Sequence, residues 1–207
     1  MKVKFGTLLM VLGSVLLAAA LALFLFNCHQ QQQASRSVDE LMPQMAEIIQ
    51  ERKASFAPVP QQPEQPEQPA EPEEPQMTVV EIDGHGYIGF LSIPSQGLDL
   101  PIMGDWSYPK LQIAPCRFTG SIKGRDLVLM AHNYNSHFGK ISKLTAGDEV
   151  HFTDMDGNIY YYEVIAKDVV APDAVEEVIS GDFPLTLFTC TYGGRSRIVV
   201  YCERVAE

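Results

Sequence analysis

The chain of 207 residues is long enough for one or two domains. Its formal net charge of −11 argues against nucleic-acid binding, because contact with a phosphate backbone needs clustered cations. Four cysteines are too few for a small disulfide scaffold. The charge is uneven along the chain: residues 1–27 carry +2, residues 28–77 carry −6 and residues 78–207 carry −7. We therefore treat the chain as three regions with these bounds.

The first region, residues 1–27, is predicted to be a short cytoplasmic tip and a transmembrane anchor. Residues 5–26 contain no charge, and as a helix they would be about 33 Å long, which matches a hydrocarbon core of about 30 Å. Lys2 and Lys4 precede the stretch, so the positive-inside rule places the N-terminus in the cytoplasm and the remainder outside. A cleaved signal peptide is the alternative, but its apolar part is usually shorter, about 7–15 residues. We expect an uncleaved single-pass anchor.

The second region, residues 28–77, is predicted to be an extracellular spacer. Ser37 and Glu40 have the spacing of a helix-capping box, and apolar residues recur at helical intervals after them. We expect a short amphipathic helix through Lys53, although Pro43 weakens it. Residues 58–75 hold seven of the fourteen prolines, mixed with Gln and Glu, which favours an extended polyproline II stalk. A ligand for a proline-recognising domain is the other interpretation.

The third region, residues 78–207, alternates short apolar stretches with turn signals, as expected of a β domain. Asp156 and Gly157 form a strong hairpin signal between two of these stretches. We predict eight strands, at residues 86–93, 98–103, 118–121, 126–132, 148–153, 158–170, 185–190 and 197–205. Short helical turns are expected at 107–113, 138–144 and 174–179. This mostly β pattern indicates an antiparallel barrel or sandwich.

A cysteine and an arginine meet in the last two predicted strands. If Gly193 and Gly194 form a two-residue turn, which the positive φ of glycine allows, Cys190 lies opposite Arg197. Alternation then puts both side chains on the face away from the apolar residues. A guanidinium beside a thiol can stabilise a thiolate or a developing oxyanion, but it cannot transfer protons, so this chemistry also needs a histidine. A buried structural cysteine is the alternative.

Of the five histidines, His132 is the preferred candidate, because it ends an apolar predicted strand beside a loop, where functional groups tend to be displayed. A structural histidine is the alternative, and His137 lies in the polar loop that follows. No His, Cys or acidic residues have metal-ligand spacing such as CxxC or HExxH, so we predict no metal and no cofactor. Cys116 and Cys202 are expected to be structural, with a disulfide between them as the lesser alternative, and Cys28 to be incidental.

Three parts of the sequence resemble the sortase family. Residues 186–190, Thr-Leu-Phe-Thr-Cys, resemble its TLxTC signature, Arg197 before Ile-Val-Val resembles the arginine that opens its last strand, and His132 after Ala resembles its histidine strand end. The resemblance covers residues 86–205 and implies a closed eight-stranded antiparallel sortase-type β-barrel with short helices. The stretch between 170 and 185 is too short for the long helical insertion of class B, and we leave the class open. Arg195, on the same face, is a rival to Arg197.

The resemblance implies a cysteine transpeptidase that cleaves an LPxTG-like sorting signal. Cys190 would attack the carbonyl after the threonine and form a thioester, His132 would act as general acid and base, and Arg197 would stabilise the oxyanion or hold the peptide. Thr189 could position the substrate carbonyl, and Tyr192 could line a peptide groove. The acyl group would pass to an amine acceptor, from a peptidoglycan precursor or a pilin lysine, outside a Gram-positive membrane.

Two other functions stay open from the sequence alone. A non-catalytic β module on a stalk, such as an adhesin or assembly scaffold, would use none of these residues chemically. A cysteine protease would hydrolyse the acyl-enzyme instead of transferring it. We predict no bound calcium, because no run of acids has the spacing of a calcium loop. The expected partners are a sorting-signal peptide of secreted surface proteins, an amine acceptor and the membrane, with no nucleic acid.

Overall fold

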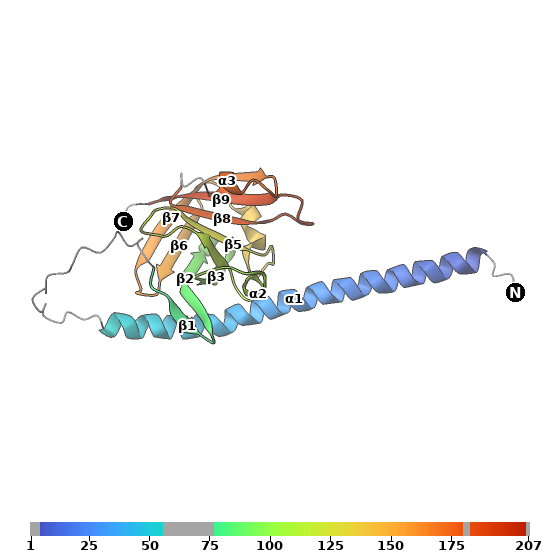
Figure 1. Ribbon diagram of the computed structural model, residues 1–207, viewed down its shortest axis with the longest axis horizontal. Helices are drawn as coiled ribbons and strands as arrows, with labels where there is room; N and C mark the ends of the chain where they lie inside the picture. The colour runs from blue at the N-terminus through green and yellow to red at the C-terminus, as the bar shows by residue number, and fades with distance from the viewer. Residues whose placement is uncertain (1–4, 56–76, 180–182, 206–207) are drawn as a thin grey trace, which may run out of the picture.

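The computed structural model describes residues 5–55, 77–179 and 183–205. Figure 1 shows one long helix that runs along the side of a β-barrel and extends beyond the barrel toward the N-terminus. The helix, α1, spans Phe5–Ser55, and the strands follow it in the chain. The stretch at residues 58–75, predicted to be a stalk, lies outside the described residues.

Helix α1 is continuous over 51 residues, so the candidate membrane span and the short helix expected through Lys53 form one element. Its first part is long and apolar enough to cross a membrane, by length and composition. Pro43 lies inside the helix without ending it. The second part turns one face toward the barrel. A stripe of five side chains at helical spacing is buried there: Ala34, Val38, Leu41, Met45 and Ile49.

The described residues contain nine strands. Their bounds are Val80–Ile82 (β1), His85–Ile93 (β2), Leu98–Met103 (β3), Cys116–Thr119 (β4), Leu127–Ala131 (β5), Glu149–Asp154 (β6), Ile159–Val170 (β7), Leu185–Cys190 (β8) and Arg197–Arg204 (β9). Strands β2 to β9 close into a barrel in the order β2-β3-β4-β5-β8-β9-β7-β6, because β6 also pairs with β2. The predicted eight-stranded barrel is therefore confirmed. Strand β1, which we did not predict, forms a short hairpin with β2.

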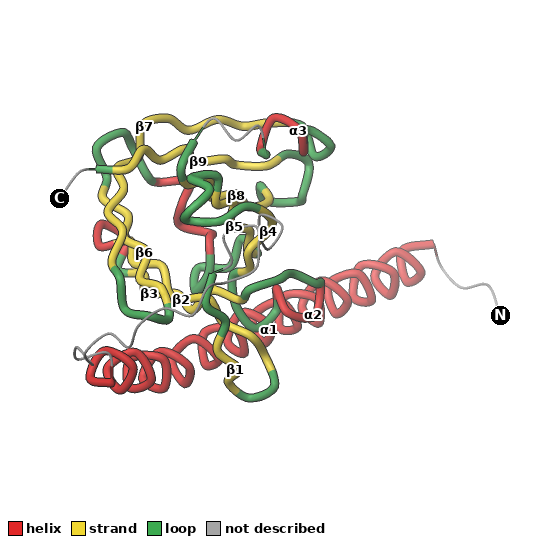
Figure 2. The backbone as a smooth tube through the Cα atoms, turned by 60° about the vertical axis from the view of Figure 1, so that its left-hand side comes forward, coloured by secondary structure: helices red, strands yellow, loops and turns green. Residues whose placement is uncertain are grey.

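The barrel is mixed and not antiparallel throughout, because β3 pairs in parallel with β4 and β5 pairs in parallel with β8. Parallel neighbours cannot share a tight turn and need a crossover. The first crossover holds α2, Tyr108–Leu111, and the second passes through η2, Phe138–Lys143, and then β6, β7 and α3, Val175–Val178 (Figure 2). Since β5 and β8 run in the same direction, their C-terminal ends meet at one end of the barrel.

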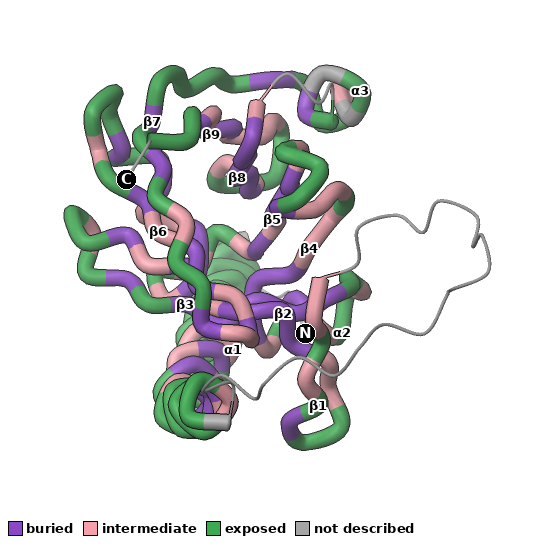
Figure 3. The backbone as a smooth tube through the Cα atoms, turned by 90° about the vertical axis from the view of Figure 1, so that its left-hand side faces the viewer, coloured by how far each residue is buried: buried purple, intermediate pink, exposed green. Residues whose placement is uncertain are grey.

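Apolar side chains build a core inside the barrel and a second cluster between the barrel and α1. The core takes alternate residues of each strand, among them Leu129 of β5 and Leu187 of β8. The second cluster joins Leu41 and Met45 of α1 to Tyr87 of β2. Figure 3, in which α1 is seen end-on, shows buried strand segments around the barrel and exposed turns at its rim. The helix is thus part of the folded domain.

Candidate active site

The β8–β9 hairpin places Cys190 opposite Arg197, in the predicted register. The predicted two-residue turn is wrong. The N–H of Thr191 donates to the carbonyl of Ser196 (2.9 Å), and the N–H of Gly194 donates back to the carbonyl of Thr191 (2.9 Å). The loop between the strands therefore has four residues, with a φ of 71° at Gly194. A bond between the hydroxyls of Thr191 and Ser196 (3.1 Å) closes its base, which explains why the strands separate one pair earlier than expected.

His132 follows β5 and lies beside the end of β8. Ala131 pairs with Thr189 in the parallel ladder, so the next positions, 132 and 190, are neighbours at the usual strand spacing of about 4.8 Å. The buried hydroxyl of Thr189 donates to the carbonyl of Ala131 (2.8 Å). This bond ties the two strands together at the last pair before the site. The Thr189 hydroxyl is therefore engaged inside the barrel.

Strand alternation puts the candidate side chains on the outer face of the barrel. Leu129 and Leu187 point into the core. His132 and Cys190 each lie three residues beyond one of them, so both face outward. Arg197, opposite Cys190, shares that face. The structure thus brings a thiol, an imidazole and a guanidinium from three adjacent strands to one end of the barrel.

The loop after β5 folds back and holds His132 in place. The N–H of Phe138 donates to the carbonyl of His132 (3.1 Å), and the N–H groups of His137 and Gly139 donate to the carbonyl of Tyr134 (2.9 and 2.8 Å). The ring centroid of Tyr134 lies 4.9 Å from that of His132 and 5.6 Å from that of His137. The tyrosine ring therefore contacts both imidazoles and links them.

Burial lowers the pKa of both histidines. Loss of solvation lowers the pKa of the half-buried His132 below its ordinary value. His137 is fully buried, and neither of its ring nitrogens has a hydrogen-bond partner within the described residues. Desolvation, with a smaller contribution from His132, lowers the pKa of His137 to about 4. The lowered pKa favours the neutral imidazole at both positions, and a neutral His132 can accept a proton.

The cations of the hairpin differ in how they are held. The guanidinium of Arg197 donates to the carbonyls of Gly194 and Ser196, both at 3.2 Å, and so lies over the loop next to Cys190. Arg195 is exposed in the loop itself. Tyr192 is 99% exposed, and its ring stands in solvent at the tip of the loop. Arg197 is therefore the better-ordered cation beside the thiol.

The four thiols are free and lie in different environments. Burial raises the pKa of Cys116 and of Cys202 to about 12, so neither ionises readily, and the alternative of a disulfide between them is wrong. Cys190 is half-buried at its strand end, and Cys28 is exposed on α1. Among the described residues, no group of three His, Cys, Asp or Glu side chains is arranged to hold a metal ion.

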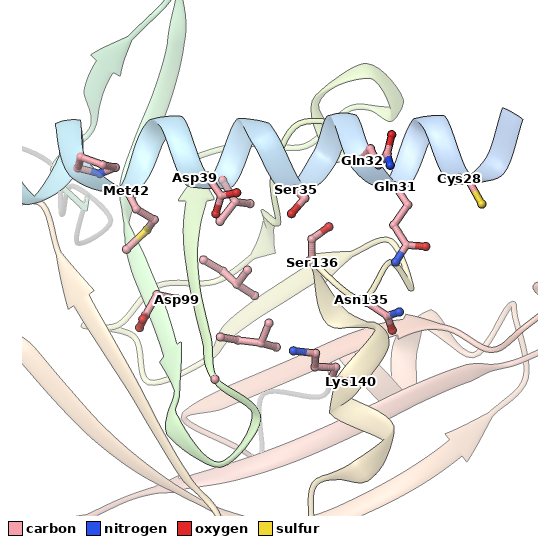
Figure 4. Close-up of a pocket in the computed structure, with 15 residues that line it drawn as sticks. Cys28, Gln31, Gln32, Ser35, Asp39, Met42, Asp99, Asn135, Ser136 and Lys140 are labelled. Atoms are coloured by element: carbon pink, nitrogen blue, oxygen red, sulfur yellow. The ribbon is translucent and has the colours of Figure 1, made fainter. Parts of the chain in front are cut away.

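A cavity of about 840 Å³ lies between α1 and the barrel. Figure 4 shows Gln31 and Ser35 of α1 on one side of it, and Asn135 and Ser136 of the loop after β5 on the other. The cavity therefore adjoins the loop that holds His132 from the side of the helix. The Tyr134 hydroxyl donates to Oε1 of Gln30 (3.2 Å) and connects the same loop directly to α1.

The sequence matches the profile of the Sortase domain over residues 91–205, more than half of the chain. This chain belongs to the sortase family. The matched region contains the strand ends with His132, Cys190 and Arg197. Sortases are cysteine transpeptidases, and the suspected family relationship is thereby confirmed.

Solved structures of other sortases share the fold. Sortase C1 from Streptococcus agalactiae is 29% identical, with a TM-score of 0.54, over 61% of this chain and 72% of that chain. Sortase C from Clostridium perfringens SM101 is 24% identical, with a TM-score of 0.53, over 88% and 97%. A Sortase D5 transpeptidase from Clostridium perfringens is 19% identical, with a TM-score of 0.56, over 84% and 99%. The last two likenesses support the fold alone. No curated protein matches this sortase.

Sequence reasoning missed two parts of this environment. Tyr134 was not identified, and His137 was assigned to a polar loop although it is fully buried. The sequence does place three ring-bearing residues within six positions, at 132, 134 and 137, and this clustering was the one signal that pointed to a contact among them. Their contact depends on the backbone bonds that fold the loop back on His132, which residue spacing does not reveal.

Proposed function

We propose that this sortase is a membrane-anchored transpeptidase that cleaves an LPxTG-like sorting signal and transfers the acyl group to an amine. The proposal rests on the register of β5, β8 and β9, which brings His132, Cys190 and Arg197 to one end and one face of the barrel. The apolar first part of α1 supports a single-pass anchor, with the N-terminus in the cytoplasm and the barrel outside.

The first chemical step forms a thioester on Cys190. The thiol gives its proton to neutral His132, and the sulfur adds to the backbone carbonyl carbon of the threonine in the signal. The guanidinium of Arg197 stabilises the developing oxyanion. When the intermediate collapses, the C–N bond breaks and the imidazolium of His132 gives its proton to the leaving amine.

The second step transfers the acyl group to the acceptor. The acceptor amine adds to the thioester carbonyl, and His132 takes a proton from the attacking nitrogen. The C–S bond then breaks, and the proton returns to the Cys190 sulfur. The acceptor is an amine of a peptidoglycan cross-bridge precursor or a pilin lysine. Thr189 acts by holding the ends of β5 and β8 together, through the bond of its hydroxyl to Ala131.

An apolar strip on the outer face leads to the proposed nucleophile. Met130 lies two residues before His132, and Phe188 two residues before Cys190, so all four share one face. Met130 and Phe188 belong to a cluster that also contains Phe118. Phe188 is buried within this cluster, whereas Met130 and Phe118 are partly exposed. We propose that the leucine and proline of the sorting signal pack against Met130 and Phe118, which directs the scissile carbonyl to the sulfur.

The experiment that tests the proposal uses the full chain in detergent with Cys28→Ser, which removes the exposed thiol on α1. LPxTG-like and NPxTN-like peptides are supplied with a set of amines, and products are identified by mass spectrometry. A new amide between the peptide and an amine, absent after Cys190→Ala, supports transpeptidation. Cleavage without an amide would support the protease instead. No cleavage by a folded protein would support the non-catalytic module.

A further inference from the structure

Helix α1 fixes where the barrel stands relative to its own apolar span. The helix continues without a break from the uncharged residues 5–26 into the part that packs on the barrel. The first buried contact, at Ala34, comes seven residues after Asn27, a rise of about 10 Å. The burial of Ala34, Leu41 and Met45 along one face prevents the barrel from turning around the helix.

The end of the barrel with the proposed active site points along α1 toward the apolar span. Figure 1 shows the β8–β9 loop extending in the same direction as the N-terminal part of the helix, and Figure 2 agrees. The loop after His132 also lies near the span, because the Tyr134 hydroxyl bonds to Gln30. Gln30 follows Phe26, the last residue of the span, by four positions, or about 6 Å.

The β8–β9 loop has the composition of a membrane-interface contact. Tyr192 is 99% exposed and Arg195 is exposed beside it. An aromatic ring and a cation are the side chains that favour the headgroup region. The opposite end of the barrel is acidic where β6 turns into β7, with Asp154 and Asp156. Strand β7 ends at Val170 opposite Arg197, so the exposed acids Asp173 and Glu176 that follow it come after the β7 end beside the loop.

We propose that the barrel end with His132 and Cys190 faces the bilayer and that the β8–β9 loop, through Tyr192 and Arg195, rests in the lipid headgroup region. The inference depends on α1 being a membrane anchor, as proposed above, and goes beyond it by assigning an orientation and a lipid-contacting surface. It follows that a scissile peptide bond and an acceptor amine reach Cys190 when both are held close to the membrane surface.

Quenching of a single tryptophan by brominated lipid tests this orientation. Trp106 is the sole tryptophan of the sequence, so Trp106→Phe with Tyr192→Trp leaves one reporter at the loop. The matched control joins Trp106→Phe to Ile159→Trp, because Ile159 is 40% exposed at the start of β7, far from Arg197. Both full-length chains are placed in phosphatidylcholine vesicles brominated near the top of the acyl chains, and flotation verifies their insertion.

We expect quenching of the Tyr192→Trp reporter to exceed that of the control by roughly twofold or more. Bromine quenches only a tryptophan that lies close to it, and the bromine atoms lie just below the headgroup region where we place the loop. A seven-residue helical insertion after His29 moves the barrel about 10 Å further from the membrane. Seven residues make nearly two full turns, so the same side of the barrel still faces the bilayer. The insertion should abolish the difference in quenching between the two reporters. Equal quenching at the two reporters, or quenching at Tyr192→Trp that survives the insertion, would overturn the proposal. Cys190→Ala should leave the quenching unchanged, so failure of the orientation is distinguishable from failure of the proposed chemistry.

Discussion

The buried imidazole of His137 makes the stability of the barrel sensitive to acid. Its pKa is about 4 in the folded chain and 6.5 when it is solvated. Below pH 6.5 the imidazole is protonated in the unfolded chain but not in the folded chain. The contribution of His137 to the free energy of unfolding is therefore complete above pH 6.5 and is lost as the pH falls toward 4. The full effect is on the order of 3 kcal/mol.

Replacing His137 with leucine should flatten this dependence. Leucine is close in size and does not titrate, so the free energy of unfolding of His137→Leu should fall less than that of the parent between about pH 7 and about pH 4.5. Urea unfolding in detergent at both pH values measures the difference. His132, whose pKa is also lowered, is present in both chains and its contribution cancels. The same pH dependence in parent and variant would show that His137 is not held neutral.

Gly139 is sterically required in the loop that holds His132. A Cβ at this position would lie 2.5 Å from the carbonyl oxygen of Asn133 and 2.7 Å from that of Tyr134. Both are backbone atoms, so the loop itself must move. We predict that Gly139→Ala lowers kcat of acyl transfer roughly tenfold or more, since small misplacements of a proton-transfer group are costly.

The matched control for Gly139→Ala is Lys143→Ala, an exposed change in the same short helix η2. Rates of amide formation, measured beside thermal unfolding, separate a misplaced His132 from a loss of folded protein. If Gly139→Ala kept the parent kcat, the loop would not be what positions His132.

Residues close in sequence were the predictable part of this site. Cys190 and Arg197 are joined by one hairpin, so glycine chemistry and strand alternation sufficed to place them opposite each other. The exact loop was not predictable, because side-chain bonds between Thr191 and Ser196 decide it. The burial of His137 depends on a loop fold set by backbone bonds, which composition does not encode.

At the scale of elements, α1 contributes to folding as well as to anchoring. Its barrel-facing side chains join a cluster with Tyr87 and Met103. Near its C-terminal end, Arg52 forms an ion pair with Asp156 (3.2 Å), an exposed pair worth little by itself. The buried apolar stripe therefore supplies most of the docking energy, and a fragment that begins at residue 78 would expose the partner cluster to water.

Met45, fully buried in that cluster, gives the sharpest test of helix docking. Met45→Ala should lower the free energy of unfolding by about 2–5 kcal/mol, through lost apolar contact and the cavity left behind. The exposed Glu47→Ala, on the other side of α1, should change it by less than about 0.5 kcal/mol. The comparison is made by measuring the unfolding of the barrel of both variants in urea. Equal midpoints for the two would mean that α1 does not dock on the barrel.

Strand positions could be predicted from local patterns, but strand partners could not. Short apolar stretches separated by turn residues located all eight barrel strands within a few residues. The parallel pairing of β5 with β8 joins segments about sixty residues apart and depends on barrel closure, which no local pattern specifies. The docking of α1 on the barrel could not be predicted either, because Ala34 and Val38 look like ordinary spacer residues in the sequence and are buried only in the folded structure.

For the whole molecule, barrel closure is what assembles the chemistry. His132 and Cys190 are brought together because two parallel strands end side by side, and Arg197 joins them through the antiparallel neighbour. The same closure seals Cys116 and Cys202 in apolar surroundings that suppress ionisation. The fold thus leaves Cys190 as the barrel thiol that is both partly exposed and next to groups able to move a proton and hold an oxyanion.

Trapping the acyl-enzyme tests this account most directly. The full chain with Cys28→Ser is incubated with a sorting-signal peptide and no amine, then analysed by intact mass and proteolytic mapping. We predict a mass increase equal to the acyl part of the peptide, mapped to Cys190, lost in Cys190→Ala and strongly reduced in His132→Asn and Arg197→Gln. An adduct on Cys116 or Cys202, or none on a folded chain, would contradict the account.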